Sequence, residues 1–186
     1  MANLILVKHS LPEIIPGLPA RQWHLSEVGR ALCKPLADKI YSYSPEVVVS
    51  SIEPKAQETT QLVANQLGLA FQTVEGLHEH ERNNVQGLGK AQFELAVADF
   101  FKYPQQLVMG EETANQAHER FAAAITSLLE NYVGKTIAVV AHGTVITLLV
   151  ARRLGIEPFP FWQQLGLPAL VVLSLPEMKL VAVESW

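Results

Sequence analysis

The chain has 186 residues, of which 49% are hydrophobic and 17% charged, and its formal net charge is -4. These values indicate one globular domain with a sizeable core, here expected over residues 1–186, and they exclude a disordered chain. The mild acidity also argues against nucleic acid as a partner, although a local pocket on such a chain can still be positive and bind a small anion.

The cysteine content and the start of the chain bear on its cellular compartment. Cys33 is the only cysteine, so no disulfide can form within the chain and a reducing compartment is expected. The apolar run Leu4-Ile5-Leu6-Val7 is too short for a signal-peptide core or a membrane span. We therefore expect a cytoplasmic protein without a membrane partner.

Predicted strands and helices alternate along the chain. The apolar runs are typical of buried strands, and capping residues, prolines and glycines bound the helical segments. In chain order we predict a strand at 4–7, a helix at 26–41, a strand at 47–49, a helix at 54–67, a strand at 71–74, a polar loop at 76–89, a helix at 91–102, a helix capped by Thr113 and ended by Gly134, a strand at 137–141, a helix at 144–154, and a hairpin of strands at 170–173 and 180–183. This order predicts an α/β protein: a three-layer α/β/α sandwich with a mostly parallel central sheet and a C-terminal hairpin.

Histidines follow two of the predicted parallel strands. His9 comes directly after the strand at 4–7, and His142 after the strand at 137–141. In an open α/β sheet, sites form beyond the carboxyl ends of the strands, so both side chains can reach one crevice. A single histidine at such a place is more often a structural hydrogen-bonding group. Two of them, each in a short motif, favour a catalytic site.

Basic residues beside these strand ends predict an anion site. Ser50 and Ser51 end the strand at 47–49, and Lys55 opens the next helix, whose N-terminal amides and dipole favour anions. Lys8 adds charge beside His9. The sum is a candidate phosphate site, although Lys55 taken alone would be interpreted as a solvated helix lysine.

The loop Leu77-His78-Glu79-His80-Glu81-Arg82 concentrates titratable groups. Loops carry function more often than other segments, and a solvated polar loop is the alternative. His78 and His80 flank a carboxylate and raise the question of a metal, but zinc would need a third protein ligand, and we expect no metal. Arg82 could reach a substrate or form a surface salt bridge.

Six segments between residues 4 and 143 follow one another in the order of a known set of motifs. They are Leu6-Val7-Lys8-His9-Ser10, Leu25-Ser26-Glu27-Val28-Gly29, the stretch from Ser50 to Thr59, Leu77-His78-Glu79, Gly110-Glu111-Glu112-Thr113 with Arg120 further on, and Val139-Val140-Ala141-His142-Gly143. In turn they resemble the Arg-His-Gly opening, the Leu-Thr-x-x-Gly helix start, the Ser-Ser-Pro-x-x-Arg-Ala-x-Gln-Thr stretch, the Leu-x-Glu acid loop, the Gly-Glu-Ser helix entry and the second His-Gly motif of the histidine phosphatase superfamily, which includes the phosphoglycerate mutases. Each motif is weak alone, and the ordered set is fairly specific.

The resemblance implies a mechanism that uses no metal and no cofactor. His9 would attack phosphorus as a neutral imidazole and form a phosphohistidine, while His142 would supply a hydrogen bond or positive charge. Glu79 would protonate the leaving alcohol and then activate water. Such an acid needs a raised pKa, which burial or a nearby anion would supply. Arg120 is expected to serve the structure, paired with a carboxylate or with the backbone.

The resemblance also implies the phosphate contacts, and it is here that the chain departs from the family. The implied contacts are Lys8, Lys55, Ser10, Ser51 and Gly143. The two lysines stand where the family has arginines, and a lysine acts as a point charge where an arginine offers a planar fork. A serine at position 10 replaces the usual glycine. The chain is therefore identified as a divergent member.

Taken together, we expect a phosphoric-monoester hydrolase that acts on a small phosphorylated molecule. A phosphomutase of the same fold and a non-catalytic protein that binds phosphorylated ligands are the alternatives. The residue pattern leaves a homo-oligomer open.

Overall fold

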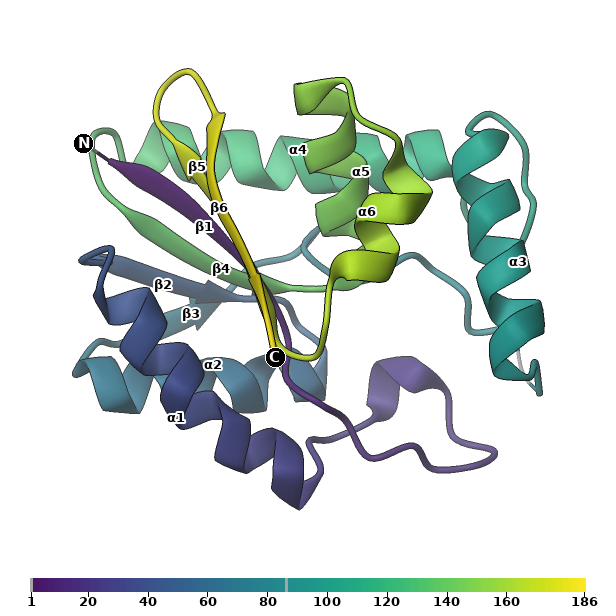
Figure 1. Ribbon diagram of the computed structural model, residues 1–186, viewed down its shortest axis with the longest axis horizontal. Coiled ribbons are helices and arrows are strands. Elements are labelled where there is room, and N and C mark those ends of the chain that lie inside the picture. Colours follow the sequence, from purple (N-terminus) through teal and green to yellow (C-terminus); the bar gives the residue numbers. More distant parts are fainter. Residues whose placement is uncertain (1, 86) are drawn as a thin grey trace.

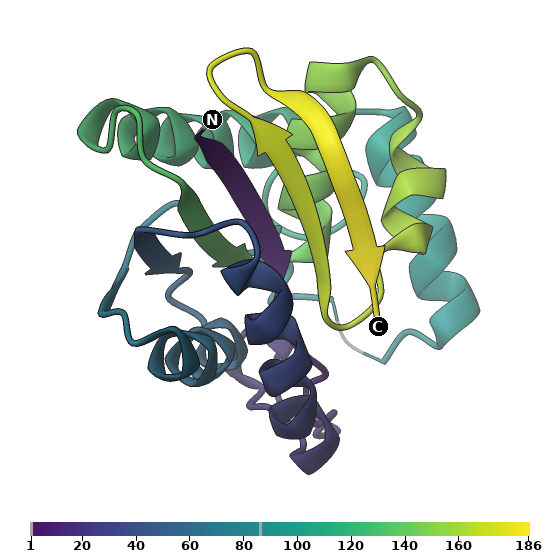
Figure 2. The same cartoon turned by 60° about the vertical axis from the view of Figure 1, so that its left-hand side comes forward.

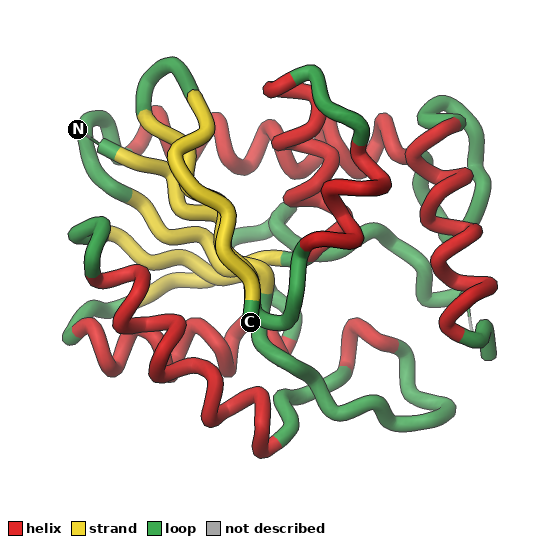
Figure 3. Tube along the Cα trace, viewed as in Figure 1, coloured by secondary structure: helices red, strands yellow, loops and turns green. Residues whose placement is uncertain are grey.

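The computed structural model describes residues 2–85 and 87–186, which form a six-stranded mixed sheet between two layers of helices (Figure 1; Figure 3). The strands are β1 (Asn3–Lys8), β2 (Val47–Ser50), β3 (Phe71–Thr73), β4 (Ile137–Ala141), β5 (Ala169–Ser174) and β6 (Lys179–Ser185). The helices are η1 (Ala20–Gln22), α1 (Glu27–Tyr41), α2 (Pro54–Leu67), α3 (Lys90–Lys102), α4 (Ala114–Asn131), α5 (Gly143–Leu154) and α6 (Pro158–Gln164). The predicted fold class is confirmed.

The strand order in the sheet is β3-β2-β4-β1-β5-β6. The first four strands run parallel, and β5 and β6 form the predicted C-terminal hairpin, with β5 antiparallel to β1. Lys8 pairs with Ala141 in the ladder between β1 and β4, and the His9 N–H donates to the Ala141 carbonyl at 3.0 Å. This register brings His9 and His142 out of the sheet at the same level.

The central strand β1 shows why the sheet needs helices on both faces. Leu4 and Leu6 belong to the core under α3, α4, α5 and α6, whereas Ile5 and Val7 belong to the core under α1 and α2. The two groups of helices cover opposite faces of the sheet (Figure 2). All four side chains are fully buried. A strand covered on both faces gains by burying every side chain, and this explains its continuous apolar run.

The ends of the helices follow their predicted capping residues. Ser26 caps α1 by accepting the Gly29 N–H, and Thr113 forms a capping box with Gln116 at the start of α4. Helix α2 starts at Pro54 and ends before Gly68, whose φ of 68° is in the left-handed region that glycine tolerates.

Two short helices were not predicted, η1 and α6. Helix α6 has seven residues, Pro-Phe-Pro-Phe-Trp-Gln-Gln, and starts with Pro158 in its first turn. Two prolines and a length under two turns leave no helical periodicity to detect. The loop predicted at 76–89 is confirmed over its described part, and position 86 lies outside the described residues. No helix in the described part of the chain is long and apolar enough to cross a membrane.

Candidate active site

The candidate site lies where the connections of two neighbouring strands diverge. From β1 the chain continues through α1 on one face of the sheet, and from β4 it continues through α5 on the other face. The carboxyl ends of such a strand pair are the usual ligand-binding place in an open α/β sheet. The rings of His9 and His142 meet there, with centroids 5.1 Å apart. The structure thus brings the two predicted histidines together.

His9 is held in the protonation state that a nucleophile needs. Its Nδ1 lies 2.8 Å from the Ser10 carbonyl oxygen. A carbonyl can only accept, so Nδ1 carries the proton and Nε2 keeps its lone pair. Burial, followed by the charges of His142 and Lys55, lowers the pKa of His9 well below its usual value. The ring is therefore neutral at pH 7.

His142 is fully buried and partly satisfied by its neighbours. Its Nε2 lies 2.8 Å from Ser51 Oγ and 3.6 Å from Glu53 Oε1. Burial and then the charge of Lys55 lower the pKa of His142 well below its usual value. Within residues 2–85 and 87–186, its buried Nδ1 has no hydrogen-bond partner. Buried polar atoms are rarely left so, and this atom can serve a ligand.

Lys55 is not a solvated helix lysine. Only 4% of it is exposed, and its Nζ donates to the Ala20 carbonyl at 2.7 Å and to the Glu53 carboxylate. The alternative interpretation of Lys55 as a solvated helix lysine is therefore wrong. Lys55 lies at the N-terminus of α2, and this end of the helix is buried in the site.

Glu53 is a site residue that the sequence analysis missed. Its carboxylate bonds Lys55, lies near His142 and accepts the Glu79 N–H at 2.8 Å. Nothing in the residue pattern marks it, because a glutamate just before Pro54 also fits an ordinary helix start. Only the burial of the carboxylate, with 7% of the residue exposed, reveals its place in the site.

Glu79 is ionised in this structure, contrary to expectation. Its Oε1 accepts the His80 N–H at 2.9 Å, and its Oε2 accepts the Thr144 N–H at the start of α5 at 3.2 Å. Burial raises the pKa of this carboxyl, but the charges of Arg82 and His142 and these two N–H groups outweigh burial and set the pKa far below its usual value. Burial alone therefore does not supply the expected raised pKa, because it is outweighed by cationic and N–H neighbours that were not foreseen.

The backbone of the acid loop is anchored by Arg120. Its guanidinium donates to the carbonyls of Gly76, His78 and Glu79 at 2.8, 2.9 and 3.2 Å, and it pairs with Glu112 at 2.6 Å. The predicted structural role of Arg120 is confirmed. Three bonds to loop carbonyls from one rigid fork fix the loop that carries the acid.

His78 and His80 have separate partners. His78 Nε2 lies 3.1 Å from Glu81 Oε1, whereas the His80 ring packs on Phe100 with centroids 4.1 Å apart. In the described part of the chain, no group of three His, Cys, Asp or Glu residues is arranged to hold a metal ion.

Lys8 and Gly143 are packed against each other. The Lys8 ammonium donates to the Leu165 carbonyl, just after α6, at 2.7 Å. A Cβ on Gly143 would lie 3.1 Å from Lys8 Cε, so glycine at the start of α5 leaves room for the lysine. Burial lowers the pKa of Lys8 to about 8, with Glu79 raising it and Arg82 lowering it further. The ammonium is thus charged at neutral pH and readily discharged above it.

Ser10 is engaged with the protein. Its hydroxyl donates to the Gly29 carbonyl at 2.7 Å, and its N–H donates to Thr59 Oγ1 at 3.0 Å. These bonds commit both donors of Ser10 to α1 and α2. Its contribution to the site is the carbonyl that fixes the proton on His9.

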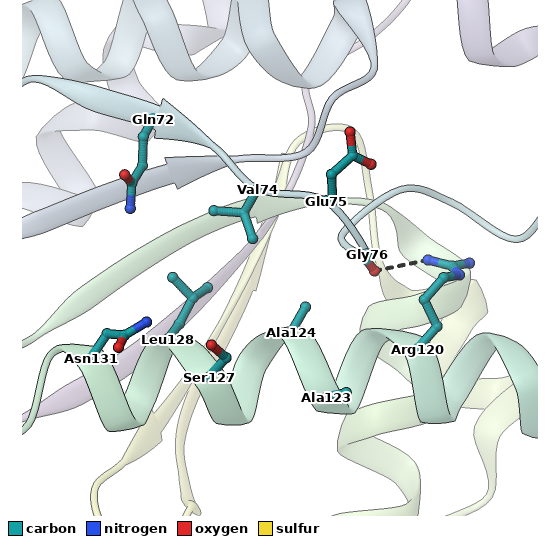
Figure 4. Close-up of a pocket in the computed structure, with 10 residues that line it drawn as sticks. All are labelled: Gln72, Val74, Glu75, Gly76, Arg120, Ala123, Ala124, Ser127, Leu128 and Asn131. Atoms are coloured by element: carbon teal, nitrogen blue, oxygen red, sulfur yellow. Dashed lines mark hydrogen bonds between the residues drawn. The ribbon is translucent and has the colours of Figure 1, made fainter.

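A groove of about 610 Å³ lies elsewhere, between β3 and α4 (Figure 4). Two residues that line the groove, Arg120 and Gly76, are joined by a hydrogen bond from the guanidinium to the Gly76 carbonyl, so the groove adjoins the start of the acid loop (Figure 4). None of the predicted site residues lines it, and its lining lacks a paired nucleophile and base; the residues are Gln72, Val74, Glu75, Gly76, Arg120, Ala123, Ala124, Ser127, Leu128 and Asn131. The groups suited to catalysis therefore lie at the histidine pair and not in this groove.

The fold and the site together define an α/β protein with two histidines, two carboxylates and two lysines at the carboxyl edge of its parallel strands. The sequence model of the histidine phosphatase superfamily (branch 1) matches residues 20–184. The chain belongs to this superfamily.

Individual relatives are distant. The uncharacterized phosphatase PhoE of Bacillus subtilis (strain 168) is 19% identical over 134 residues, and the alignment covers 72% of this chain and 66% of that protein, slightly less than two thirds. Phosphoserine phosphatase from Entamoeba histolytica, solved with 3-phosphoglyceric acid, has a TM-score of 0.81 at 20% identity, covering 100% of this chain and 98% of that one. A mycobacterial glucosyl-3-phosphoglycerate phosphatase has a TM-score of 0.78 at 20% identity, with the same coverage. At these identities the solved structures show a shared fold.

Proposed function

We propose that the protein hydrolyses a phosphoric monoester through a phosphohistidine intermediate on His9. The observation that carries this proposal is the bond from His9 Nδ1 to the Ser10 carbonyl, which leaves an unprotonated Nε2 beside His142. A neutral imidazole needs no base to become a nucleophile. Membership of the histidine phosphatase superfamily supports the same chemistry.

The reaction follows in two displacements. In the first, His9 Nε2 forms a bond to phosphorus, the ester P–O bond breaks, and the carboxylic acid of Glu79 gives its proton to the leaving oxygen. In the second, Glu79 accepts a proton from water, the water oxygen bonds phosphorus, and the P–N bond breaks. Phosphate leaves and His9 is neutral again. Lys8 and Lys55 offset the charge on the phosphoryl oxygens.

His142 and Ser51 complete the phosphate site in this proposal. The Glu53 carboxylate, 3.6 Å from His142 Nε2, favours a proton on that nitrogen. Ser51 Oγ then accepts from His142 Nε2 and from the Glu53 N–H at 3.3 Å, which leaves the Ser51 O–H to donate to a ligand. The dianionic ligand would in turn favour a second proton, on the buried Nδ1 of His142. Gly143 contributes by making room for Lys8.

Small phosphorylated molecules are the proposed substrates. The solved relatives named above are phosphatases of phosphoserine and of glucosyl-3-phosphoglycerate, whose substrates are of this size. Substrate choice within that class rests with the loops at 11–23 and 76–89.

The proposal is tested by turnover of an aryl phosphate with EDTA present. We expect hydrolysis that survives the chelator and that vanadate inhibits, because cationic side chains stabilise the transferring group. A wild-type enzyme that turns over no ester in a broad panel would overturn the proposal. If such an enzyme still binds inorganic phosphate, a binding protein is the better description.

Alkaline pH is expected to weaken catalysis through Lys8. Its pKa is about 8, so its charge is complete below that pH and is lost as the pH rises through it. The value of kcat/KM, which reports the free enzyme, should therefore fall above about pH 8. In Lys8→Arg the charge persists, and the fall should move to higher pH. If kcat/KM falls over the same alkaline pH range in both enzymes, Lys8 does not contribute its charge to phosphate binding.

A further inference from the structure

Three parts of the site converge on Arg82, in the loop between β3 and α3. Its NH2 group lies 3.7 Å from Glu79 Oε2, and its NH1 group donates to Thr144 Oγ1, at the start of α5, at 3.5 Å. Its Cζ lies 5.1 Å from the centre of the Phe93 ring, on α3. The side chain is 19% exposed. Arg82 is thus a cation of the site and not part of a surface salt bridge.

The contacts of Arg82 are looser than those of the two lysines. Lys8 and Lys55 each donate to a backbone carbonyl at 2.7 Å. A guanidinium has five N–H donors. Within residues 2–85 and 87–186, the guanidinium of Arg82 makes no hydrogen bond shorter than 3.5 Å. Of the three cations, Arg82 loses least when it turns toward a ligand.

The charge of Arg82 acts on four titratable groups in and around the site. Burial is the main cause of the lowered pKa of Lys8, His80 and His142, and the positive charge of Arg82 lowers each of them further. The same charge lowers the pKa of Glu79 against the effect of burial. An anion placed among these groups would therefore be attracted by Arg82 as well.

We propose that Arg82 is a substrate-binding residue whose guanidinium turns from Glu79 to the phosphoryl oxygens of the ester. The inference rests on the proposed function and adds a residue to it. A planar fork can donate two parallel hydrogen bonds to a phosphoryl group, whereas an ammonium acts as a point charge. Arg82 thereby supplies the forked donor that Lys8 and Lys55 lack.

This movement also explains how Glu79 becomes an acid. In the structure, burial raises the pKa of Glu79, and the charge of Arg82 is the largest of the contributions that nevertheless hold it far below its usual value. A phosphoryl dianion that draws Arg82 away removes this effect and adds a like charge, and both changes raise the pKa of the carboxyl. Glu79 can then take up one proton from solvent. Substrate binding and readiness of the acid are linked through one guanidinium.

Titration with inorganic phosphate tests this role separately from turnover. Calorimetry would compare the wild type with Arg82→Gln and Arg82→Lys. We expect phosphate affinity to fall roughly 10- to 100-fold in Arg82→Gln, the effect of losing a hydrogen bond to a charged group, and to recover only partly in Arg82→Lys. Arg153→Gln is the matched control, since Arg153 is exposed at the far end of α5 and its loss changes the net charge equally.

Proton uptake gives a second readout, which a purely structural role would not move. The titrations are run in buffers of different ionisation enthalpy, at a pH low enough for free Arg82→Gln to hold part of the Glu79 proton. They should show fewer protons taken up by this variant than by the wild type, because its Glu79 carboxyl already has a higher pKa. Wild-type affinity and wild-type proton uptake in Arg82→Gln would overturn the inference. If that variant fails to unfold cooperatively, wild-type affinity in Arg82→Lys would overturn it. A wild type that binds phosphate without turnover would overturn the proposed function, while the titrations still decide on Arg82.

Discussion

Alanine in place of His9 is expected to reduce turnover of an aryl phosphate by roughly 10⁴-fold or more, as removal of a nucleophile does in other enzymes. The variant lacks the atom that bonds to phosphorus, and no intermediate can form. The loss should not change with pH around neutrality, because burial lowers the pKa of His9 well below its usual value and keeps the ring neutral there in the wild type. Steady-state kinetics with a nitrophenyl ester measures the loss.

The fold of the His9→Ala variant should survive. The substitution removes one hydrogen bond, from Nδ1 to the Ser10 carbonyl, at a cost of about 1 kcal/mol. Urea unfolding would confirm this, and His118→Ala on α4 is the matched histidine control, expected to retain full activity. Retained turnover in a folded His9→Ala enzyme contradicts the nucleophile assignment. Partial rescue by added imidazole would support it directly.

The fold could be predicted from the sequence where the apolar runs and the prolines and glycines that bound the elements agree. A run such as Leu4-Ile5-Leu6-Val7 has few alternatives to a strand covered on both faces, and Pro54 and Gly68 bound α2 in the structure as predicted. Helix α6 was missed because its formation depends on packing. Phe161, only 6% exposed, is buried against the core and holds a segment whose own sequence does not favour a helix.

The positions of the two histidines could also be predicted, because topology alone brings the carboxyl ends of neighbouring parallel strands together. The low pKa of the acid, Glu79, could not be predicted in this way. Glu79 is ionised through contacts with Thr144, 65 positions away, and with the loop cation Arg82. Such contacts depend on how a loop folds back over α5, which no local pattern specifies. The burial of Glu53 escaped prediction for the same reason.

Glutamine in place of Glu79 is expected to slow esters with poor leaving groups far more than esters with good ones. An alkoxide needs a proton as the P–O bond breaks, whereas a nitrophenolate leaves without one. We expect kcat/KM to fall about 10²–10⁴-fold for an alkyl phosphate, the range of general acid catalysis, and roughly tenfold or less for the nitrophenyl ester.

The comparison has to be made on kcat/KM, since this quantity ends at the first irreversible step, formation of the phosphohistidine. The same variant also lacks the base that activates water, so its kcat should fall for every ester and a burst of nitrophenol should precede slow turnover. The two carboxylate oxygens of Glu79 accept one N–H each, from His80 and from Thr144, so the single amide oxygen of glutamine keeps one of these bonds. The loop remains anchored by Arg120. Equal losses of kcat/KM for both esters, without a burst, would mean that Glu79 positions other groups electrostatically and is not the acid. Its buried neighbour Glu53 would then be the next candidate for the acid.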